Sequence, residues 1–408
     1  MEKLHIAMPS QVEKIIDRLR QGGYEAYAVG GCVRDSLLGR EPGDWDIATS
    51  ARPEEVKRLF LRTVDTGIRH GTVTVLMEGT GYEVTTYRID GEYEDGRHPK
   101  QVAFTSELVE DLRRRDFTIN AMAYGPETGI VDAFDGKGDL KRRIIRCVGN
   151  AMERFGEDAL RILRAIRFSA QLDFAIEEET YEAISRIAPN LAKVSKERIQ
   201  VELTKLLCSD HPETIRKVYE TGISRYISPT FAELPWQDFR MPEGLPPVKY
   251  VRWAAFLRLA GPDRAVQVLK DLKLDNDTIS RVRTLSAWAD SEIRPEAAAV
   301  RRAMSGMDPE LWDVLTELNG YGMEIRRLTE EIRARGDCLD LRHLAVDGQD
   351  LIAAGVRPGR ELGQILKKLL DQVLECPEKN EREALLDEVK RISFCNPGNK
   401  KLAGKKDI

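Results

Sequence analysis

The chain has 408 residues and a formal net charge of −5, with 42% hydrophobic and 32% charged residues. This length favours two to four domains, and the composition is that of an ordinary soluble protein that can bury a core. No apolar run reaches the roughly 18 residues of a membrane helix, and the first residues are amphipathic rather than signal-like. We therefore expect a cytoplasmic protein with no membrane partner.

Neither the cysteines nor the net charge indicates a zinc protein, a disulfide-rich protein or a nucleic-acid binder. The six cysteines show no CxxC spacing. This argues against a zinc site and a disulfide framework, so we expect reduced and mostly buried thiols. The negative net charge does not indicate a nucleic-acid binder, although a local basic stripe is enough to follow a phosphate backbone.

The first third of the chain alternates between strand-like and helical patterns. Four short segments, rich in β-branched and aromatic residues and bounded by Gly, Pro or Asp, are expected to be strands. They are 24–31, 44–49, 72–77 and 82–88. Residues 53–61 are expected to form a helix. Beyond about Gly149 the pattern is almost entirely helical, with breaks at 229–247 and near Pro295. The order predicts an α+β domain with a small mixed sheet, followed by all-α domains.

The segment 30–49 carries the first chemical pattern. Gly30 and Gly31 stand where a strand turns into a helix, which lets backbone N–H groups approach a phosphate. Asp44 and Asp46 follow on the next expected strand, and residues two apart on a strand share a face. Paired carboxylates suit Mg²⁺ and phosphoryl transfer. A DxD pair alone is usually a solvated surface feature, but the Gly-Gly turn and Arg34 favour the metal site.

Glu83 is the nearest acidic candidate on an adjacent strand. It is placed to polarise an attacking hydroxyl or to help hold a metal. The alternative, a partly exposed strand residue without a catalytic role, stays open.

A basic motif follows in LRRRDFTINAMA, residues 112–123. Arg115 is a candidate bidentate donor to a triphosphate. Asp116 would orient a neighbour or a sugar hydroxyl, and Asn120 would hydrogen-bond locally. Taken alone, three consecutive arginines are more typical of a solvated face.

The segment 154–168 is expected to be one helix, on which Asp158, Arg161, Arg164 and Arg167 recur every third residue along one side. A carboxylate only accepts hydrogen bonds and a guanidinium only donates them. Cytosine and adenine both present an amino donor beside a ring-nitrogen acceptor, whereas uracil and guanine present a carbonyl that a carboxylate repels. Asp158 and Arg161 together would therefore select C and A without a template. An ordinary ion-paired helix face is the alternative.

These motifs, in this order, resemble the class II tRNA nucleotidyltransferases, the bacterial CCA-adding enzymes. The family combines GGxVRDxLLGRxPxDxDIAT, a flexible loop, RRDFTxNA and EDxxRxxRAxRF. The corresponding segments here are 30–49, 90–100, 114–121 and 157–168. The match is specific over about residues 20–210 and looser from there to about residue 392.

The resemblance implies four parts. They are a nucleotidyltransferase head (1–149), a helical neck for base recognition (150–210), a helical body (211–300) and a helical tail that binds tRNA (301–408). It also implies a set of site residues. Asp44 and Asp46 would bind two Mg²⁺ ions, Gly31, Arg34 and Arg115 would hold the nucleotide, and Asp158 and Arg161, helped by Arg164 and Arg167, would read the base. Loop 90–100 would switch the site from C to A.

The activity implied is template-independent addition of CMP and AMP, from CTP and ATP, to the acceptor end of tRNA, with release of pyrophosphate. The loop argues against a CC-only enzyme, and the lack of a long basic extension argues against a bacterial poly(A) polymerase. An A-only enzyme stays open. The presence of both Asp44 and Asp46 argues against a tRNA-binding protein without catalytic activity, because such a protein has no use for a costly pair of acids. The sequence does not distinguish a monomer from a homodimer.

Overall fold

The structure is a computed structural model that describes residues 5–91 and 102–394. The chain forms two compact units, which are described separately. The first comprises Met1–Met241, Pro247–Phe256 and Val266–Ile279, and the second Pro242–Pro246, Leu257–Ala265 and Ser280–Ile408. The first unit contains the expected head and neck. The division into head, neck, body and tail stays a prediction.

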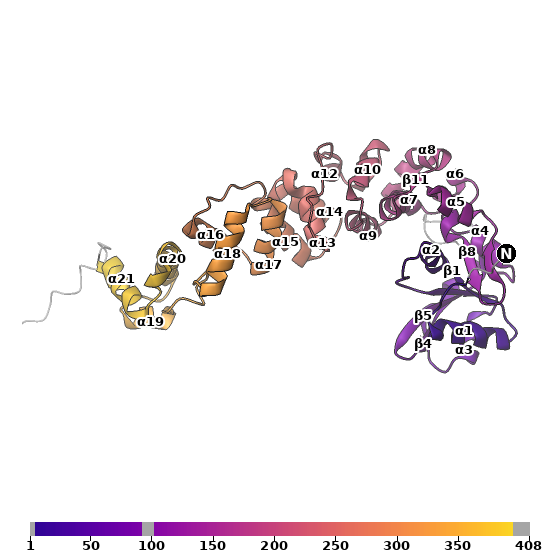
Figure 1. The fold of residues 1–408 in the computed structure, drawn as a ribbon, viewed down its shortest axis with the longest axis horizontal. Coiled ribbons are helices and arrows are strands. Elements are labelled where there is room, and N and C mark those ends of the chain that lie inside the picture. The colour runs from indigo at the N-terminus through magenta and orange to yellow at the C-terminus, as the bar shows by residue number, and fades with distance from the viewer. Residues whose placement is uncertain (1–4, 92–101, 395–408) are drawn as a thin grey trace, which may run out of the picture. The chain divides into compact units, whose positions relative to one another are not determined.

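A seven-stranded sheet forms the centre of the first unit, in the order β3-β4-β5-β2-β1-β8-β9 (Figure 1). Its strands are β1 Ala26–Val29, β2 Asp46–Thr49, β3 Thr63–Gly67, β4 Thr72–Met77, β5 Thr80–Thr86, β8 Met122–Gly125 and β9 Gly129–Asp132. The sheet is mixed, as expected, because β2 and β5 are parallel while the other neighbours are antiparallel. Pairing of Val29 with Asp46 places the start of β2 at the edge where β1 ends.

The strand predictions were partly wrong at their boundaries. Within the seven-stranded sheet, three strands were missed, namely β3, β8 and β9. All four residues of β8 are buried, so its sequence lacks the alternation that identifies a half-exposed strand. The expected strand 82–88 is divided between β5 and β6 Arg88–Asp90, which pairs with β7 Val102–Phe104 in a separate ribbon. Most of the predicted loop 90–100 lies outside the described residues.

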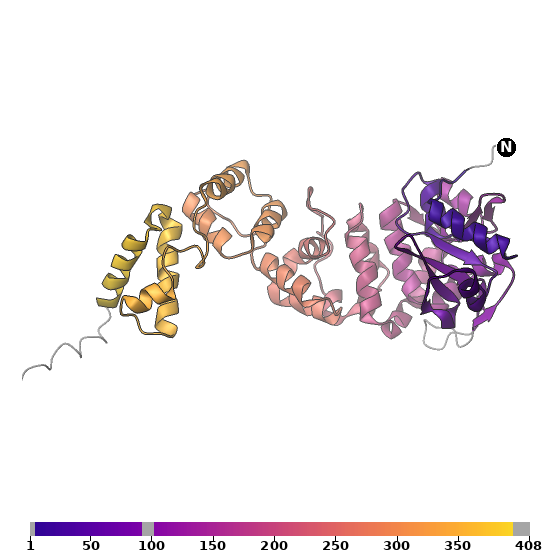
Figure 2. The same cartoon turned by 90° about the horizontal axis from the view of Figure 1, so that it is seen from below.

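Amphipathic helices cover the sheet. Helix α1 (Ser10–Gln21) buries Val12, Ile15, Ile16 and Leu19 and contacts β1 and β2; Figure 2 shows it in indigo beside the strands. Helix α3 (Pro53–Leu59) contacts α1, β4 and β5. Helix α2 (Gly31–Leu37) instead contacts β1, β8 and the 3₁₀ turn η2 (Thr118–Asn120). Helix α2 and turn η2 carry Arg34 and Asn120, two polar residues of the candidate active site.

The rest of the first unit is helical apart from a short ribbon of β10 (Ile144–Ile145) and β11 (Ala175–Ile176). Its central helix α7 (Leu160–Leu172) is buried over most of its length and packs on α9 (Lys196–Leu207). The other helices are α4 Leu108–Arg113, α5 Gly136–Arg142, α6 Ala151–Glu157, α8 Glu178–Ile187, α10 Arg216–Glu220, α11 Ser224–Ile227 and α12 Pro229–Ala232.

The prediction of one helix over 154–168 was wrong. Helix α6 ends at Glu157, and Asp158 is extended, with φ −141° and ψ 102°. Its carboxylate Oδ1 accepts a hydrogen bond from the Leu160 backbone N–H at 3.0 Å. Asp side chains compete with the helix in this way by bonding a backbone group two residues on. Asp158 therefore stands at a break before α7 rather than on its surface.

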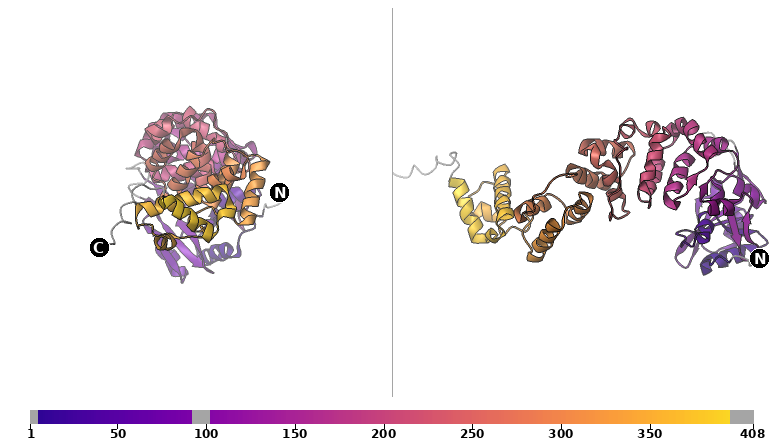
Figure 3. Two further views of the ribbon diagram at one scale, coloured as in Figure 1. Left: turned by 90° about the vertical axis from the view of Figure 1, so that its left-hand side faces the viewer. Right: turned by 45° about the horizontal axis from the view of Figure 1, so that its top comes forward.

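Every regular element described in the second unit is a helix (Figure 3). Three helices cross the boundary between the units in sequence: α13 Lys249–Leu257, which belongs to the first unit except for Leu257, and α14 Pro262–Asp271 and α15 Asn276–Ala287, which are each divided between the two units. The helices that belong wholly to the second unit are α16 Ala297–Ser305, α17 Pro309–Leu318, α18 Met323–Arg335, α19 Gly348–Ala353, α20 Arg360–Glu375 and α21 Arg382–Phe394. The last three pack around one apolar cluster that includes Leu351, Leu369 and Val389. Across the described residues, no helix is both long and apolar enough to cross a membrane. The fold class is thus as expected, an α+β head followed by helices.

Candidate active site

One cavity of about 590 Å³ in the first unit brings together residues from the end of β1 to α9. Nearly all the site residues predicted from sequence line it. They are Gly31, Arg34, Asp44, Asp46, Arg115, Asp158, Arg161, Arg164 and Arg167. Eight of the lining residues are Arg or Lys and five are Asp. A chain with a negative net charge therefore has a locally basic cavity, which suits a polyanionic ligand.

The glycine turn is shaped for a close approach. Gly30 has φ +80°, a backbone conformation that L side chains rarely adopt. A Cβ atom at Gly30 would lie 2.9 Å from Nη1 of Arg115. A glycine is therefore needed here for Arg115 to lie over the turn.

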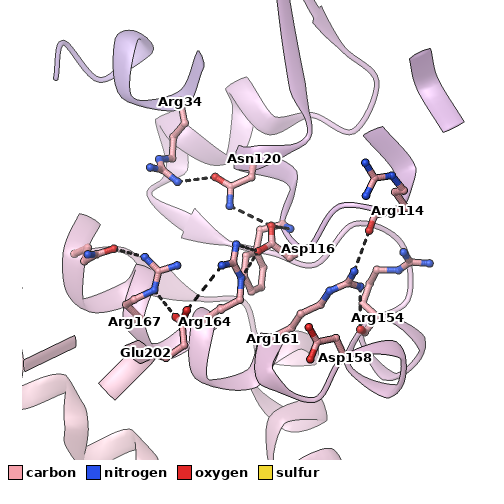
Figure 4. Close-up of polar contacts among 12 residues, drawn as sticks. Arg34, Arg114, Asp116, Asn120, Arg154, Asp158, Arg161, Arg164, Arg167 and Glu202 are labelled. Carbon is pink, nitrogen blue, oxygen red and sulfur yellow. Dashed lines mark hydrogen bonds and ion pairs between the residues drawn. The ribbon is translucent and has the colours of Figure 1, made fainter. Parts of the chain in front are cut away.

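A chain of hydrogen bonds holds the polar side chains beneath this turn (Figure 4). Arg34 donates from Nη1 to Oδ1 of Asn120 at 2.6 Å, and Asn120 donates from Nδ2 to Oδ1 of Asp116 at 3.1 Å. Asp116 also accepts from Arg164, whose Nε and Nη2 lie 2.8 and 2.6 Å from Oδ2. Burial alone would raise the pKa of Asp116, but Arg164 and Arg161 outweigh it and hold that pKa well below its usual range. The charged carboxylate fixes Arg164.

The acidic residues gather at the start of β2. Asp46 is the first residue of β2, but Asp44 precedes the strand, so the prediction of both on one strand was wrong. Asp46 is exposed at the surface, but partial desolvation by its surroundings raises the pKa of its carboxyl, and Asp44 raises it further while Arg115 opposes the shift. Glu83 is exposed on the neighbouring strand β5, and partial desolvation, Asp46 and Asp44 likewise raise its pKa. The three carboxyl groups are therefore close enough to repel one another, and a cation relieves such repulsion.

These acids fit a metal that shares its ligands with a substrate. Within residues 5–91 and 102–394, no group of three or more His, Cys, Asp or Glu side chains is arranged to hold a metal ion. Glu83 is also not among the residues that line the cavity. Mg²⁺ usually takes one or two carboxylates and completes its shell with phosphates and water. The observed set, Asp44 and Asp46 in the cavity, matches that requirement.

The two residues predicted to read the base, Asp158 and Arg161, have hydrogen-bond partners outside α7. Asp158 accepts from the Arg198 guanidinium, whose Nη2 lies 2.6 Å from Oδ2. Arg161 donates to Oε2 of Glu157 at 2.7 Å and to the backbone carbonyl of Arg114 at 3.1 Å. Both side chains therefore keep a fixed position at the cavity wall (Figure 4).

Arg167 is the most enclosed of the predicted residues. Its Nε donates to Oε2 of Glu202 at 2.6 Å, and its guanidinium carbon lies 3.9 Å from the centre of the Phe168 ring. The side chain is only 8% exposed. Arg34 and Arg164 also lie over Phe168, at 5.0 and 5.4 Å, so one ring organises three cavity arginines through cation–π contacts.

Sequence reasoning missed three cavity or support residues on α9. Arg198 and Lys205 line the cavity, and Glu202 pairs with Arg167. Their spacing of four and three residues is the helical repeat of one face. Glu202 could have been detected, because it adjoins the apolar positions Ile199, Leu203 and Leu206 of the same helix, and an acidic residue buried among them needs a partner.

Three family models match the chain. Residues 26–146 match the poly A polymerase head domain, 173–234 the probable RNA and SrmB-binding site of polymerase A, and 249–389 a putative domain 2 of tRNA nucleotidyltransferase. The fold and the cavity thus define a nucleotidyltransferase with a poly(A) polymerase-type head.

Relatives that match nearly the whole chain show which family of nucleotidyltransferases this is. The chain is 41% identical to the CCA-adding enzyme of Levilactobacillus brevis, over 94% of this chain and 97% of the relative. It resembles the crystal structure of the Bacillus stearothermophilus CCA-adding enzyme in complex with CTP, with 34% identity, a TM-score of 0.79 and coverage of 95% and 98%. The Thermotoga maritima CCA-adding enzyme complexed with tRNA matches at 25% identity and a TM-score of 0.65, over 96% of this chain and 97% of that one. The chain belongs to the family of CCA-adding enzymes.

Proposed function

We propose that this protein builds and repairs the 3′-terminal CCA of tRNA, transferring CMP and AMP from CTP and ATP and releasing pyrophosphate. One observation carries the proposal. A single cavity contains the paired acids Asp44 and Asp46 together with Asp158 and Arg161, which present an acceptor and a donor. Solved relatives contain CTP or tRNA, and this supports the same substrates here.

The basic wall would bind the nucleotide triphosphate. Arg115 lies over the Gly30 turn and Gly31 begins α2 beside it, so both face the cavity next to Asp46. Arg34 and Arg164, which Asn120 and Asp116 hold in place, add positive charge. Guanidinium groups pair with phosphate oxygens through two parallel hydrogen bonds. Positioning and charge neutralisation account for most of the catalysis in this reaction class.

Asp158 and Arg161 would select the base. A carboxylate has about four acceptor sites, and Leu160 and Arg198 occupy only one on each oxygen. The amino group of cytosine or adenine can therefore still donate to Asp158 while Arg161 donates to the ring nitrogen. Arg167 supports this wall through Glu202.

We further propose Mg²⁺ as the divalent cation, held by Asp44 and Asp46. When bound, it supplies charge neutralisation at the triphosphate and the leaving pyrophosphate. Glu83 lies on the neighbouring strand β5, close enough to Asp46 and Asp44 for both to raise its pKa, but outside the cavity lining. It is our candidate to polarise the attacking tRNA 3′-hydroxyl or to help hold the metal.

The test uses three tRNA transcripts, which end before CCA, after the first C and after CC. Each is incubated with CTP alone, ATP alone and both, and products are resolved by gel. A CCA-adding enzyme extends all three to CCA. Extension of the CC transcript alone would identify an A-only enzyme, and long A tails would identify a poly(A) polymerase. Binding without extension would leave a tRNA-binding protein.

A further inference from the structure

Asp111 is a buried carboxylate that lies behind the cavity wall. It belongs to α4, its side chain is 1% exposed, and it is not among the residues that line the cavity. Two cavity arginines nevertheless bind it. Arg114 donates to Oδ1 from Nε at 2.9 Å and from Nη2 at 2.7 Å, and Arg115 donates from Nη2 to Oδ2 at 3.3 Å.

The same carboxylate reaches a third segment. The backbone N–H of Arg88, the first residue of β6, donates to Oδ1 of Asp111 at 3.3 Å. Arg114 in turn accepts a hydrogen bond at its carbonyl from Nη2 of Arg161 at 3.1 Å. Asp111 therefore joins the β6–β7 ribbon to Arg115 directly and to Arg161 through Arg114.

The neighbouring arginines keep the Asp111 carboxyl in its charged form. Burial alone would raise its pKa, but Arg114 and Arg115 outweigh burial and lower the pKa below its usual value. A buried anion is costly unless several charged hydrogen bonds compensate it. Its partner Arg115 lines the cavity and reaches Asp111 through one nitrogen, Nη2. The guanidinium thus has donor capacity left for a ligand in the cavity, while Asp111 restrains its direction.

We propose that Asp111 is a positioning residue for the nucleotide site, which aims Arg115 at the triphosphate and steadies Arg161 through Arg114. The proposal rests on the proposed function, in which Arg115 binds phosphate. Asp111 touches no substrate and acts through these arginines.

The two oxygens of Asp111 have different partners, which allows a selective test in Asp111→Asn. An amide of the same shape keeps its oxygen toward the three donors of Arg88 and Arg114, so its NH₂ group faces Arg115. Two donors then oppose each other, and Arg115 is released. We expect KM for CTP and for ATP to rise about tenfold, because a misdirected Arg115 keeps only part of a charged hydrogen bond to the triphosphate. KM for tRNA should stay unchanged.

Asp139→Asn is the matched control. Asp139 is also buried, and it accepts from Nη2 of Arg142 at 2.8 Å and from Oγ1 of Thr118 at 2.7 Å. It does not line the cavity. Its amide variant loses a comparable buried charge, so it should lower Tm while leaving both nucleotide KM values unchanged.

A double-mutant cycle separates this proposal from the site assignment. In an Arg115→Ala background, Asp111→Asn should add little to the nucleotide KM. If Arg115→Ala leaves both KM values unchanged, the proposed nucleotide site fails. If Arg115→Ala raises them and Asp111→Asn does not, Asp111 has no positioning role.

Should Asp111→Asn not fold, Asp111→Glu keeps the charge and moves the carboxylate by one methylene. The same rise in nucleotide KM is expected, and unchanged values overturn the proposal.

Discussion

Replacing Asp158 by Asn tests base selection with almost no change in shape. The Leu160 N–H is part of the backbone and cannot move away, so the amide oxygen should stay on it. Arg198 is 21% exposed and can turn to solvent. The amide NH₂ should therefore take the place of Oδ2 and present a donor to the base.

Such a donor matches O4 of uracil and opposes the amino group of cytosine. Loss of one charged hydrogen bond, about 2 kcal/mol, lowers kcat/KM for CTP by roughly thirtyfold. UTP gains a partner, so the C/U ratio should fall by more than that factor. Asp158→Ala removes the acceptor without adding a donor and should reduce the C/U ratio less.

The assay measures kcat/KM for each nucleoside triphosphate on a tRNA transcript that ends before CCA, and for ATP and GTP on one that ends in CC. Arg198→Met is the control, because it removes the same ion pair and leaves Asp158 in place. We expect this control to keep its preference for C over U. Unchanged C/U and A/G ratios in Asp158→Asn would show that Asp158 does not read the base.

Three further predictions follow from the cavity and its surroundings. Asp44→Ala or Asp46→Ala should abolish both C and A addition and leave tRNA binding in a filter assay largely intact; substantial activity with saturating Mg²⁺ would refute the metal assignment. Replacing 90–100 by a short Gly-Ser linker should preserve CC addition and cripple terminal A addition, and equal loss of both would point to general support of the fold. Burial raises the thiol pKa of Cys32 to about 11 and of Cys147 to about 12; both thiols are therefore protonated at pH 8, and rapid alkylation seen by mass spectrometry would contradict this packing.

The sequence by itself determined the chemistry that depends on short spacings. The Gly-Gly turn, the pair Asp44 and Asp46, and the three-residue steps from Asp158 to Arg167 are local patterns, and all of these residues line one cavity. Helix periodicity places Arg161, Arg164 and Arg167 along one side of α7. Asp44 and Asp158 precede β2 and α7, and their short separation in sequence from Asp46 and Arg161 keeps them at the same cavity. The helical character after residue 149 could be predicted because apolar residues recur there with the period of a helix.

Only the tertiary structure decided which distant groups hold these residues in place. Arg198 binds Asp158 across 40 positions, and Arg164 binds Asp116 across 48. The β8 strand is buried on all sides beside β1, so its pattern carries no alternation to reveal it. The helix break at Asp158 arises because its side chain accepts the Leu160 N–H and pairs with Arg198. Periodicity reports which face of an element is buried, whereas the partner of a buried charge depends on how remote segments pack, and that is settled only when the whole unit folds.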